Sequence, residues 1–138
     1  MLRYVVAALV IAGGGFAAFH FLQKPASAAK AAAPKPPTVS SVVLPPLTTN
    51  LADTDQVRLV QVGLTATLVG DQAQAAWAAH LAAIQDATIG ALRTRTSAQL
   101  NGKQAMTQLA ADLESAYNKI LGDAGKVTKI YFTQFVVQ

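Results

Sequence analysis

The sequence predicts an α+β domain, with helices packed on a mixed sheet, attached to a membrane by one helix. Three observations predict this class. Residues 4–22 form an uncharged apolar run, residues 58–68 alternate apolar and polar side chains, and residues 71–122 repeat apolar side chains every three or four positions. In a chain of 138 residues, this leaves room for one folded domain after the anchor.

The membrane anchor is predicted at residues 4–22, behind a short tail of residues 1–3. At a rise of about 1.5 Å per residue, such a helix matches a hydrocarbon core of about 30 Å. The alternative is a signal peptide cleaved at Ala26–Ala28, but signal peptides have shorter apolar cores of about 7–15 residues, so we favour a retained anchor. Small residues spaced four apart predict a helix-packing face in the membrane: Ala8, Ala12, Gly13, Gly14, Ala17 and Ala18.

The net charge of +4 comes from the N-terminal part of the chain. The four basic residues that precede Ser41 lie on both sides of the anchor, so charge counting leaves its orientation open. Residues 23–40 are rich in Ala, Lys and Pro and are predicted to form an extended spacer. Residues 41–138 carry seven acidic and seven basic side chains, which gives no basic surface for nucleic acid.

Three strands are expected in residues 41–138. Val42–Leu51 contains Pro45 and Pro46, which suit an edge strand or a bulge. Arg58–Leu68 is predicted to be a strand with one buried face. Val127–Val137 has apolar side chains on both faces, as expected of a strand covered on both sides.

Two helices are expected between the second and third strands. Asp71 and Gln74 fit a capping-box-like start for a helix that continues to about Leu92, and Asn101 is a predicted cap for a second helix that Gly122 ends. The apolar stripes predicted to face the core are Trp77, Leu81, Ile84, Thr88 and Leu92 on the first helix, and Met106, Leu109, Leu113, Tyr117 and Ile120 on the second.

Residue types for catalysis are scarce. Residues 41–138 contain one histidine, His80, one glutamate, Glu114, and no cysteine. Asp53 and Asp55 lack the rest of a calcium loop and are interpreted as a solvated turn. We therefore predict no catalytic residue, metal site, cofactor or small-molecule substrate, and a binding or assembly module instead. Trp77, Arg93 and Arg95 are candidate protein-interface residues, although Trp77 also fits a core position.

The last nine residues, IYFTQFVVQ, resemble the C-terminal signature of the flagellar basal-body-associated FliL family. Four earlier segments occur in the same order as in that family: TTNL at residues 48–51, RLVQVGLTATL at 58–68, IQDATIGAL at 84–92 and LNGKQAMTQLAADLESAYNKIL at 100–121. The positions that carry the resemblance are Asn50, Leu51, Asp86, Ile89, Leu92, Gly102, Asn118, Tyr131, Phe132, Phe135, Val136 and Gln138.

Two positions depart from the family pattern. Gln85 stands where the family commonly has arginine, and Ala83 lies near a position that is often proline. The first difference puts in doubt any contact that the arginine makes, and the second allows a straighter helix.

The resemblance implies a single-pass protein of the bacterial inner membrane, with a cytoplasmic N-terminus and a periplasmic domain similar to the SPFH fold of stomatin. It further implies association with the MotA/MotB stator of the flagellar basal body, as a homo-oligomeric ring that supports rotation, swimming, swarming and chemotaxis. One alternative is a membrane-tethered stomatin-like scaffold unrelated to flagella. Another is an envelope hydrolase or small-ligand binder, for which His80 and Glu114 are the main resources.

Overall fold

The computed structural model describes residues 33–138, which form an α+β domain, as predicted. The elements in chain order are β1 (Val39–Asn50), β2 (Leu59–Val69), α2 (Ala73–Ala79), α3 (Leu81–Arg93), the 3₁₀ turn η1 (Ala98–Leu100), α4 (Lys103–Leu121), the 3₁₀ turn η2 (Gly122–Ala124) and β3 (Lys126–Val137). The predicted anchor and its small-residue face lie outside the described residues. Within residues 33–138, no helix has the length and hydropathy of a membrane span.

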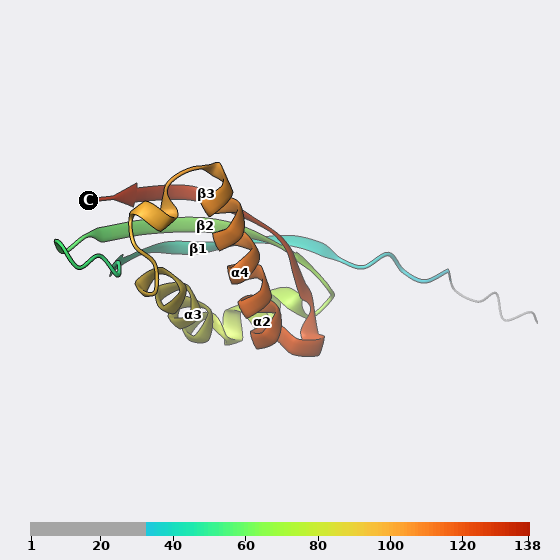
Figure 1. The fold of residues 1–138 in the computed structure, drawn as a ribbon. Coiled ribbons are helices and arrows are strands. Elements are labelled where there is room, and N and C mark those ends of the chain that lie inside the picture. Colours follow the sequence, from blue (N-terminus) through green and yellow to red (C-terminus); the bar gives the residue numbers. More distant parts are fainter. Residues whose placement is uncertain (1–32) are drawn as a thin grey trace, which may run out of the picture. The chain divides into compact units, whose positions relative to one another are not determined.

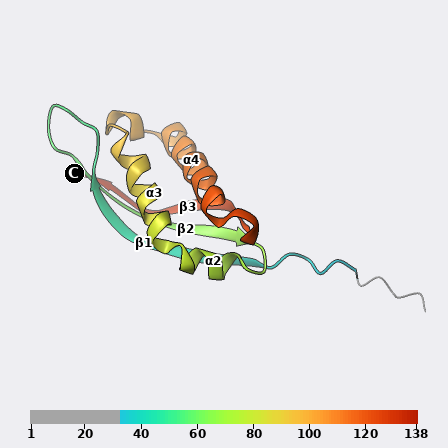
Figure 2. The same ribbon diagram turned by 90° about the horizontal axis from the view of Figure 1, so that it is seen from below.

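The sheet has three strands in the order β1-β2-β3, with β2 in the centre. Both neighbouring pairs are antiparallel, so the prediction of a mixed sheet is wrong. The hairpin connection of β1 to β2 and the return of the chain after α4 both reverse direction. Helices α3 and α4 cover one face of the sheet (Figures 1 and 2), so the domain has two layers.

Strand β2 has the one buried face that its alternation predicts. Its even-numbered side chains are fully buried against the helices: Val60, Val62, Leu64, Ala66 and Leu68. The odd-numbered side chains point to the opposite face of the sheet, because successive residues of a strand alternate.

Strand β1 is an edge strand with a bulge, as its prolines predict. The pairing of β1 with β2 shifts register between Leu44 and Leu47, which places Pro45 and Pro46 in the irregularity. The strand starts at Val39, earlier than predicted, because residues with weak strand propensity are held by pairing with β2. The Gly70 N–H donates to the Thr38 carbonyl at 2.9 Å and continues that pairing.

Strand β3 lies at the other edge and is covered on one face only, so the prediction of a strand covered on both sides is wrong. Val127 and Ile130 are buried, whereas Tyr131 is 55% exposed and Val136 is 40% exposed. The helices occupy one side of the sheet, and nothing within residues 33–138 covers the other. Apolar side chains on both faces of β3 therefore do not indicate a central strand here.

The predicted helix from Asp71 to Leu92 is divided at His80 into α2 and α3, so the prediction of one continuous helix is wrong. No Gly or Pro marks the break in the sequence. The capping box does not form either. Gln72 occupies the N-cap position without a side-chain bond, and the Asp71 carboxylate instead accepts a hydrogen bond from the Thr38 hydroxyl.

Helix α4 ends as predicted and begins differently. Gly122 stops it with φ of 55°, a conformation that favours glycine. At the other end the N-cap residue is Gly102, with φ of 95°, and not Asn101. Asn101 instead follows the turn η1.

The core contains one buried polar network between the helices. The Tyr117 hydroxyl lies 2.5 Å from the Thr88 hydroxyl, which donates to the Ile84 carbonyl at 2.7 Å. Burial raises the pKa of Tyr117 to about 12. Trp77 packs edge-on against the Tyr117 ring, with centroids 5.4 Å apart. These contacts hold α2, α3 and α4 in one arrangement.

Candidate functional site

Two connections meet at one end of the domain, which we call the loop end: residues 51–58 between β1 and β2, and residues 94–102 between α3 and α4. Backbone bonds join them, because the Ala52 N–H donates to the Arg95 carbonyl at 2.8 Å. The first connection is closed on itself by the Leu51 N–H, which donates to the Arg58 carbonyl at 2.9 Å. The C-terminal residues of β3 lie at the same end (Figure 1).

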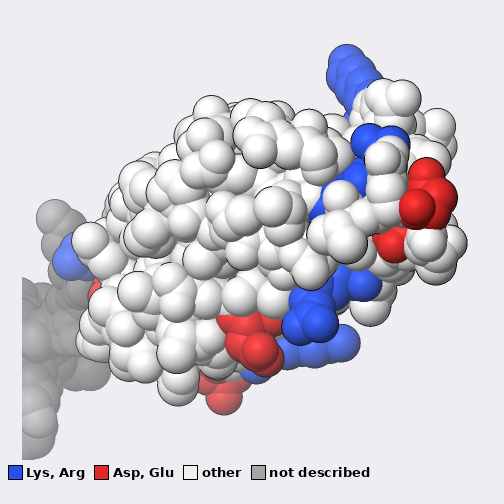
Figure 3. All heavy atoms as spheres, turned by 90° about the vertical axis from the view of Figure 1, so that its left-hand side faces the viewer, with Lys and Arg blue, Asp and Glu red and all other residues white. Residues whose placement is uncertain are grey.

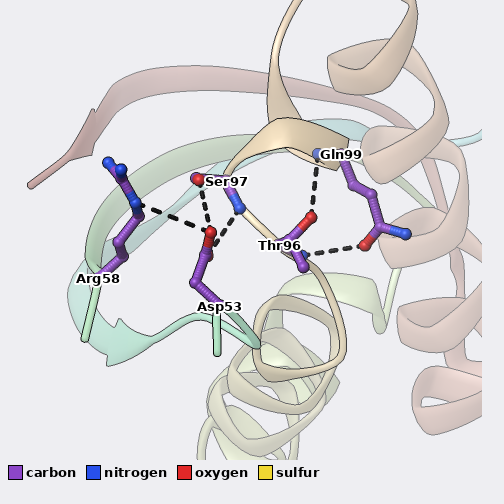
Figure 4. Close-up of polar contacts among 5 residues, drawn as sticks. All are labelled: Asp53, Arg58, Thr96, Ser97 and Gln99. Carbon is purple, nitrogen blue, oxygen red and sulfur yellow. Dashed lines mark hydrogen bonds and ion pairs between the residues drawn. The ribbon is translucent and has the colours of Figure 1, made fainter. Parts of the chain in front are cut away.

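Asp53 is the centre of the polar contacts at the loop end (Figure 4). Its carboxylate accepts from the Ser97 hydroxyl at 2.7 Å and from the Ser97 N–H at 2.8 Å, and the Arg58 guanidinium lies 3.7 Å away. The Ser97 hydroxyl, the Ser97 N–H and the Arg58 charge lower the pKa of Asp53, against the effect of partial burial. The side chain is only 9% exposed, so the interpretation of Asp53 as part of a solvated turn is wrong.

Thr96 and Gln99 form the reciprocal bonds that define a capping box (Figure 4). The Thr96 N–H donates to the Gln99 side-chain oxygen at 3.0 Å, and the Gln99 N–H donates to the Thr96 hydroxyl at 3.3 Å. The pattern Thr-x-x-Gln at residues 96–99 is a capping-box signal in the sequence that our prediction missed. It orders the segment that carries Ser97.

The two arginines predicted at an interface differ in their surroundings. Arg95 donates to the Ala91 carbonyl at 2.6 Å and forms an ion pair with Asp112 of α4, so it ties the loop end to that helix. Arg93 is exposed at the end of α3, and its side chain has no bonding partner among residues 33–138. Trp77 is 4% exposed and belongs to the core. Of the three candidates, Arg93 is the one whose side chain is free to contact another molecule.

A hollow of about 410 Å³ lies between η1 and the end of β3. It is lined by Arg58, Ser97, Ala98, Leu100, Asn101, Phe135 and Val137, which combine apolar side chains with one guanidinium group. Sequence reasoning did not identify this hollow, because its residues come from three segments that are far apart in the chain.

Charged side chains at the loop end lie next to one another in both signs. Figure 3 views this end of the domain and shows Lys and Arg beside Asp and Glu along the right and lower margins, while the centre and upper left of this face are uncharged. Such mixed charge suits a protein contact better than a polyanion.

The residues considered for catalysis are dispersed. His80 lies exposed between α2 and α3, and Glu114 lies on α4. Within residues 33–138, no group of three or more His, Cys, Asp and Glu side chains is close enough to hold a metal ion. The hydroxyls that bond to carboxylates in this part of the chain, Ser97 to Asp53 and Thr38 to Asp71, connect segments that are far apart in the sequence.

Several positions of the family resemblance have visible structural roles. Leu51 and Leu92 are buried, and Gly102 begins α4. Asn118 accepts from the Val127 N–H at 2.7 Å and donates to the Val127 carbonyl at 3.1 Å. Gln138 exchanges two backbone bonds with Leu59 at 2.8 and 2.9 Å.

The other resemblance positions lie at or near the surface. Ile89, Phe132 and Phe135 are half-buried, and the rings of Phe132 and Phe135 meet at 6.0 Å. The exposed members are Asn50, Asp86, Tyr131 and Val136.

Comparisons with known proteins agree with the resemblance. The sequence model of the family described as "Flagellar basal body-associated protein FliL" matches residues 41–138. The "Flagellar protein FliL" of Aquifex aeolicus (strain VF5) is 30% identical over 94 residues, which cover 68% of this chain and 58% of the relative. The chain therefore matches little more than half the length of that relative. Since the family model covers the folded domain from β1 through β3, the chain belongs to the FliL family of flagellar basal body-associated proteins.

Proposed function

We propose that this protein is a non-enzymatic accessory subunit of the flagellar motor that associates with the MotA/MotB stator. In this role a ring of copies supports flagellar rotation, and through it swimming, swarming and chemotaxis. The observation that carries the proposal is the family match over residues 41–138, which are the residues that fold into the domain.

The proposed placement of the chain follows from the same family membership and from the sequence. Residues 1–3 are cytoplasmic, residues 4–22 cross the inner membrane, and residues 23–40 form a spacer. The domain of residues 41–138 is periplasmic and has a stomatin-like fold. The basic residues on the two sides of the anchor leave its direction open, so the proposed orientation rests on family membership. The small-residue face at Gly13 and Gly14 remains a prediction for lateral contact in the membrane.

The loop end is the surface we assign to the partner, with Arg93 as its contact residue. Asp53, Ser97 and Arg95 fix the two connections to each other and to α4, so that a partner meets an ordered surface. Arg93 projects from this ordered region without a partner within residues 33–138, and its guanidinium suits an acidic or polar surface on a stator subunit.

A motility assay tests the proposal. A strain that lacks the gene is expected to swim and swarm less well, most clearly under viscous load, and the wild-type gene is expected to restore motility. Normal motility of the deletion strain under load would contradict the proposal and favour the stomatin-like scaffold unrelated to flagella.

The contact residue is tested in the same strain. Arg93→Glu is expected to fail in restoring motility and to reduce co-localisation with a fluorescent stator subunit. Lys119→Glu makes the same charge change at an exposed position of α4 and serves as the matched control. Equal behaviour of the two variants would remove Arg93 from the contact.

A further inference from the structure

Strand β3 lies at one margin of the sheet, and the pairing register identifies which of its backbone groups point away from β2. Leu59 and Gln138 exchange both of their backbone bonds, at 2.9 and 2.8 Å. In an antiparallel pair, bonded and non-bonded positions alternate, so the odd-numbered residues of β2 bond to β3. The β3 residues opposite even-numbered residues of β2 therefore direct their N–H and C=O groups toward the open edge: Val127, Ile130, Phe132, Phe135 and Val137.

One of these five positions is already occupied. The Asn118 side-chain amide bonds to both the N–H and the C=O of Val127, at 2.7 and 3.1 Å. No group of residues 33–138 bonds to the edge-directed backbone groups of the other four positions. The edge that is available to a further strand therefore extends from Ile130 to Val137.

This edge lacks the features that prevent strand addition. On β1, Pro45 and Pro46 lie in a bulge, and both features discourage pairing with another strand. Residues 130–137 of β3 contain neither a charge nor a proline. The extra residue Thr133 is no obstacle, because the regular strand β2 already pairs with β3 on both sides of it. A regular strand can therefore pair along the whole open edge.

A hollow for side chains lies beside the open edge. Phe135 and Val137 are opposite buried residues of β2, so their side chains lie on the helix-covered face, where they line the hollow of about 410 Å³ with Leu100 of η1. An added strand carries every second side chain on this same face. The charge of Arg58, which also lines the hollow, is balanced by Asp53 at 3.7 Å. The hollow therefore suits an apolar side chain of the added strand.

A basic side chain marks the other end of the open edge. Lys129 is exposed opposite Thr67, on the face without helices, and its ammonium group lies 6.0 Å from the centre of the Tyr131 ring. Lys129 forms no ion pair within residues 33–138, and residues 126–138 contain two lysines and no acidic residue. Opposite charges that face each other across two strands stabilise the pairing. The added strand is therefore favoured by an acidic residue opposite Lys129.

We propose that the β3 edge binds an extended acidic segment of another protein as a further antiparallel strand of the sheet. The register is the one that β2 uses. The first, third and fifth residues of the segment are apolar and lie opposite Val137, Phe135 and Phe132, and the eighth is acidic and lies opposite Lys129. Backbone bonds supply affinity in this mode of recognition, while the hollow and Lys129 supply specificity. The binding site goes beyond the proposed function and does not depend on it.

Peptide selection tests the proposal. A random library of eight-residue peptides displayed on phage is selected on the full chain in lipid nanodiscs. The enriched peptides are expected to have apolar first, third and fifth residues and an acidic eighth residue. The proposal is overturned if no such pattern is enriched. It is also overturned if the enriched peptides reproduce residues 130–137 of this chain, because the occupant is then a second copy.

Blocking the edge tests where a selected peptide binds. Val137→Pro removes an N–H that points away from β2 and so keeps the bonds between β2 and β3. It is expected to weaken binding of the labelled peptide by about tenfold, measured by fluorescence anisotropy. Val43→Pro is the matched control on β1, since Val43 lies opposite Thr65 and its N–H also points away from β2. Equal binding by Val137→Pro and the parent chain overturns the proposal.

A charge exchange tests the register without a change to the backbone. Lys129→Glu is expected to weaken binding of the selected peptide, and a synthetic peptide with lysine as its eighth residue is expected to restore it. Lys126→Glu makes the same change at an exposed residue beyond the open edge and is expected to have a smaller effect. Failure of the lysine peptide to restore binding overturns the register. Motility is not measured, so the result is independent of the flagellar proposal.

Discussion

Asp53 shows how one carboxylate can order a surface that has no helix or strand of its own. It accepts two bonds from Ser97, a residue 44 positions away in the chain, and faces Arg58 on the same connection. Hydrogen bonds to an ionised acceptor are stronger than bonds between neutral groups. The loop end is thus held by charge-assisted bonds.

The pKa of Asp53 leads to a prediction at acidic pH. Because the folded-state pKa lies below the ordinary value of 3.8, the ionised form stabilises the fold. This contribution is complete above the unfolded-state pKa and is lost as the pH falls through the folded-state pKa. Asp53→Asn is expected to lower the melting temperature by a few degrees at pH 7, and by progressively less below about pH 4.

Thermal unfolding followed by circular dichroism across pH 2–7 measures this dependence. Asp55→Asn is the matched control, since Asp55 is exposed two residues away and forms no bond within residues 33–138. A deficit of Asp53→Asn that stayed constant down to the lowest pH would show that the charge of Asp53 does not contribute.

Individual residues were predicted from the sequence where one local pattern decides their environment. Gly122 at the end of α4 and the alternating side chains of β2 are of this kind. Asp53 was not, because its burial depends on Ser97 from a distant segment. Arg95 was predicted at an interface, but its free-energy contribution includes the ion pair with Asp112, which no sequence spacing indicates.

At the level of elements, the helices were predicted better than their ends. The apolar stripes of both predicted helices reach the core, as Ile84, Leu109 and Leu113 show. The break at His80 was missed because no Gly or Pro marks it in the sequence. In the structure the His80 N–H donates to Ala76 and the Ile84 N–H donates to His80, so both bonds end at the residue that divides the helices. The N-cap of the first helix was predicted at the wrong residue, because the Asp71 carboxylate accepts a hydrogen bond from Thr38 and does not cap the helix.

Substitution of two glycines by alanine is expected to change the stability of the domain in opposite directions. Gly125, just before β3, lies close to Val69 and Ala73 of the same chain. A Cβ added there would lie 2.8 Å from the Val69 carbonyl oxygen and closer still to Ala73. Gly90 lies on the exposed side of α3, where an added Cβ meets nothing within 4 Å. Gly125→Ala is therefore expected to destabilise the domain by about 1–3 kcal/mol. Gly90→Ala is expected to stabilise it by about 0.5–1 kcal/mol, through helix propensity.

Chemical denaturation of the two variants in parallel measures both free energies of unfolding. Each variant is the control for the other, because both replace glycine by alanine and only the surroundings of the residue differ. A destabilised Gly90→Ala protein, or a Gly125→Ala protein as stable as the parent, would show that these contacts do not decide the outcome.

For the whole molecule, the α+β class followed from the sequence because the core strand and the helices are strongly patterned. The direction and position of β3 did not follow, since its apolar side chains on both faces fit a central strand equally well. Only the three-dimensional arrangement shows that α3 and α4 cover a single face of the sheet (Figure 2). Tyr131 and Val136 are exposed. The hollow and the loop end depend on the same arrangement.

The position of β3 also decides what its removal does. A chain that ends before Ile130 loses the buried Ile130 and the half-buried Phe132 and Phe135, and it leaves β2 without its second neighbour. Burial of one large apolar side chain contributes about 1.5–3 kcal/mol, while a whole domain is stable by only about 5–15 kcal/mol. We expect the shortened chain to show no cooperative thermal transition by circular dichroism.

In the full-length chain, Ile130→Ala is expected to lower the free energy of unfolding by about 2–5 kcal/mol and Tyr131→Ala by much less, because Ile130 is 6% exposed and Tyr131 is 55% exposed. If the shortened chain still unfolded cooperatively, the two-stranded remainder with its helices would be the folding unit, and β3 would be an added strand available for pairing with other chains.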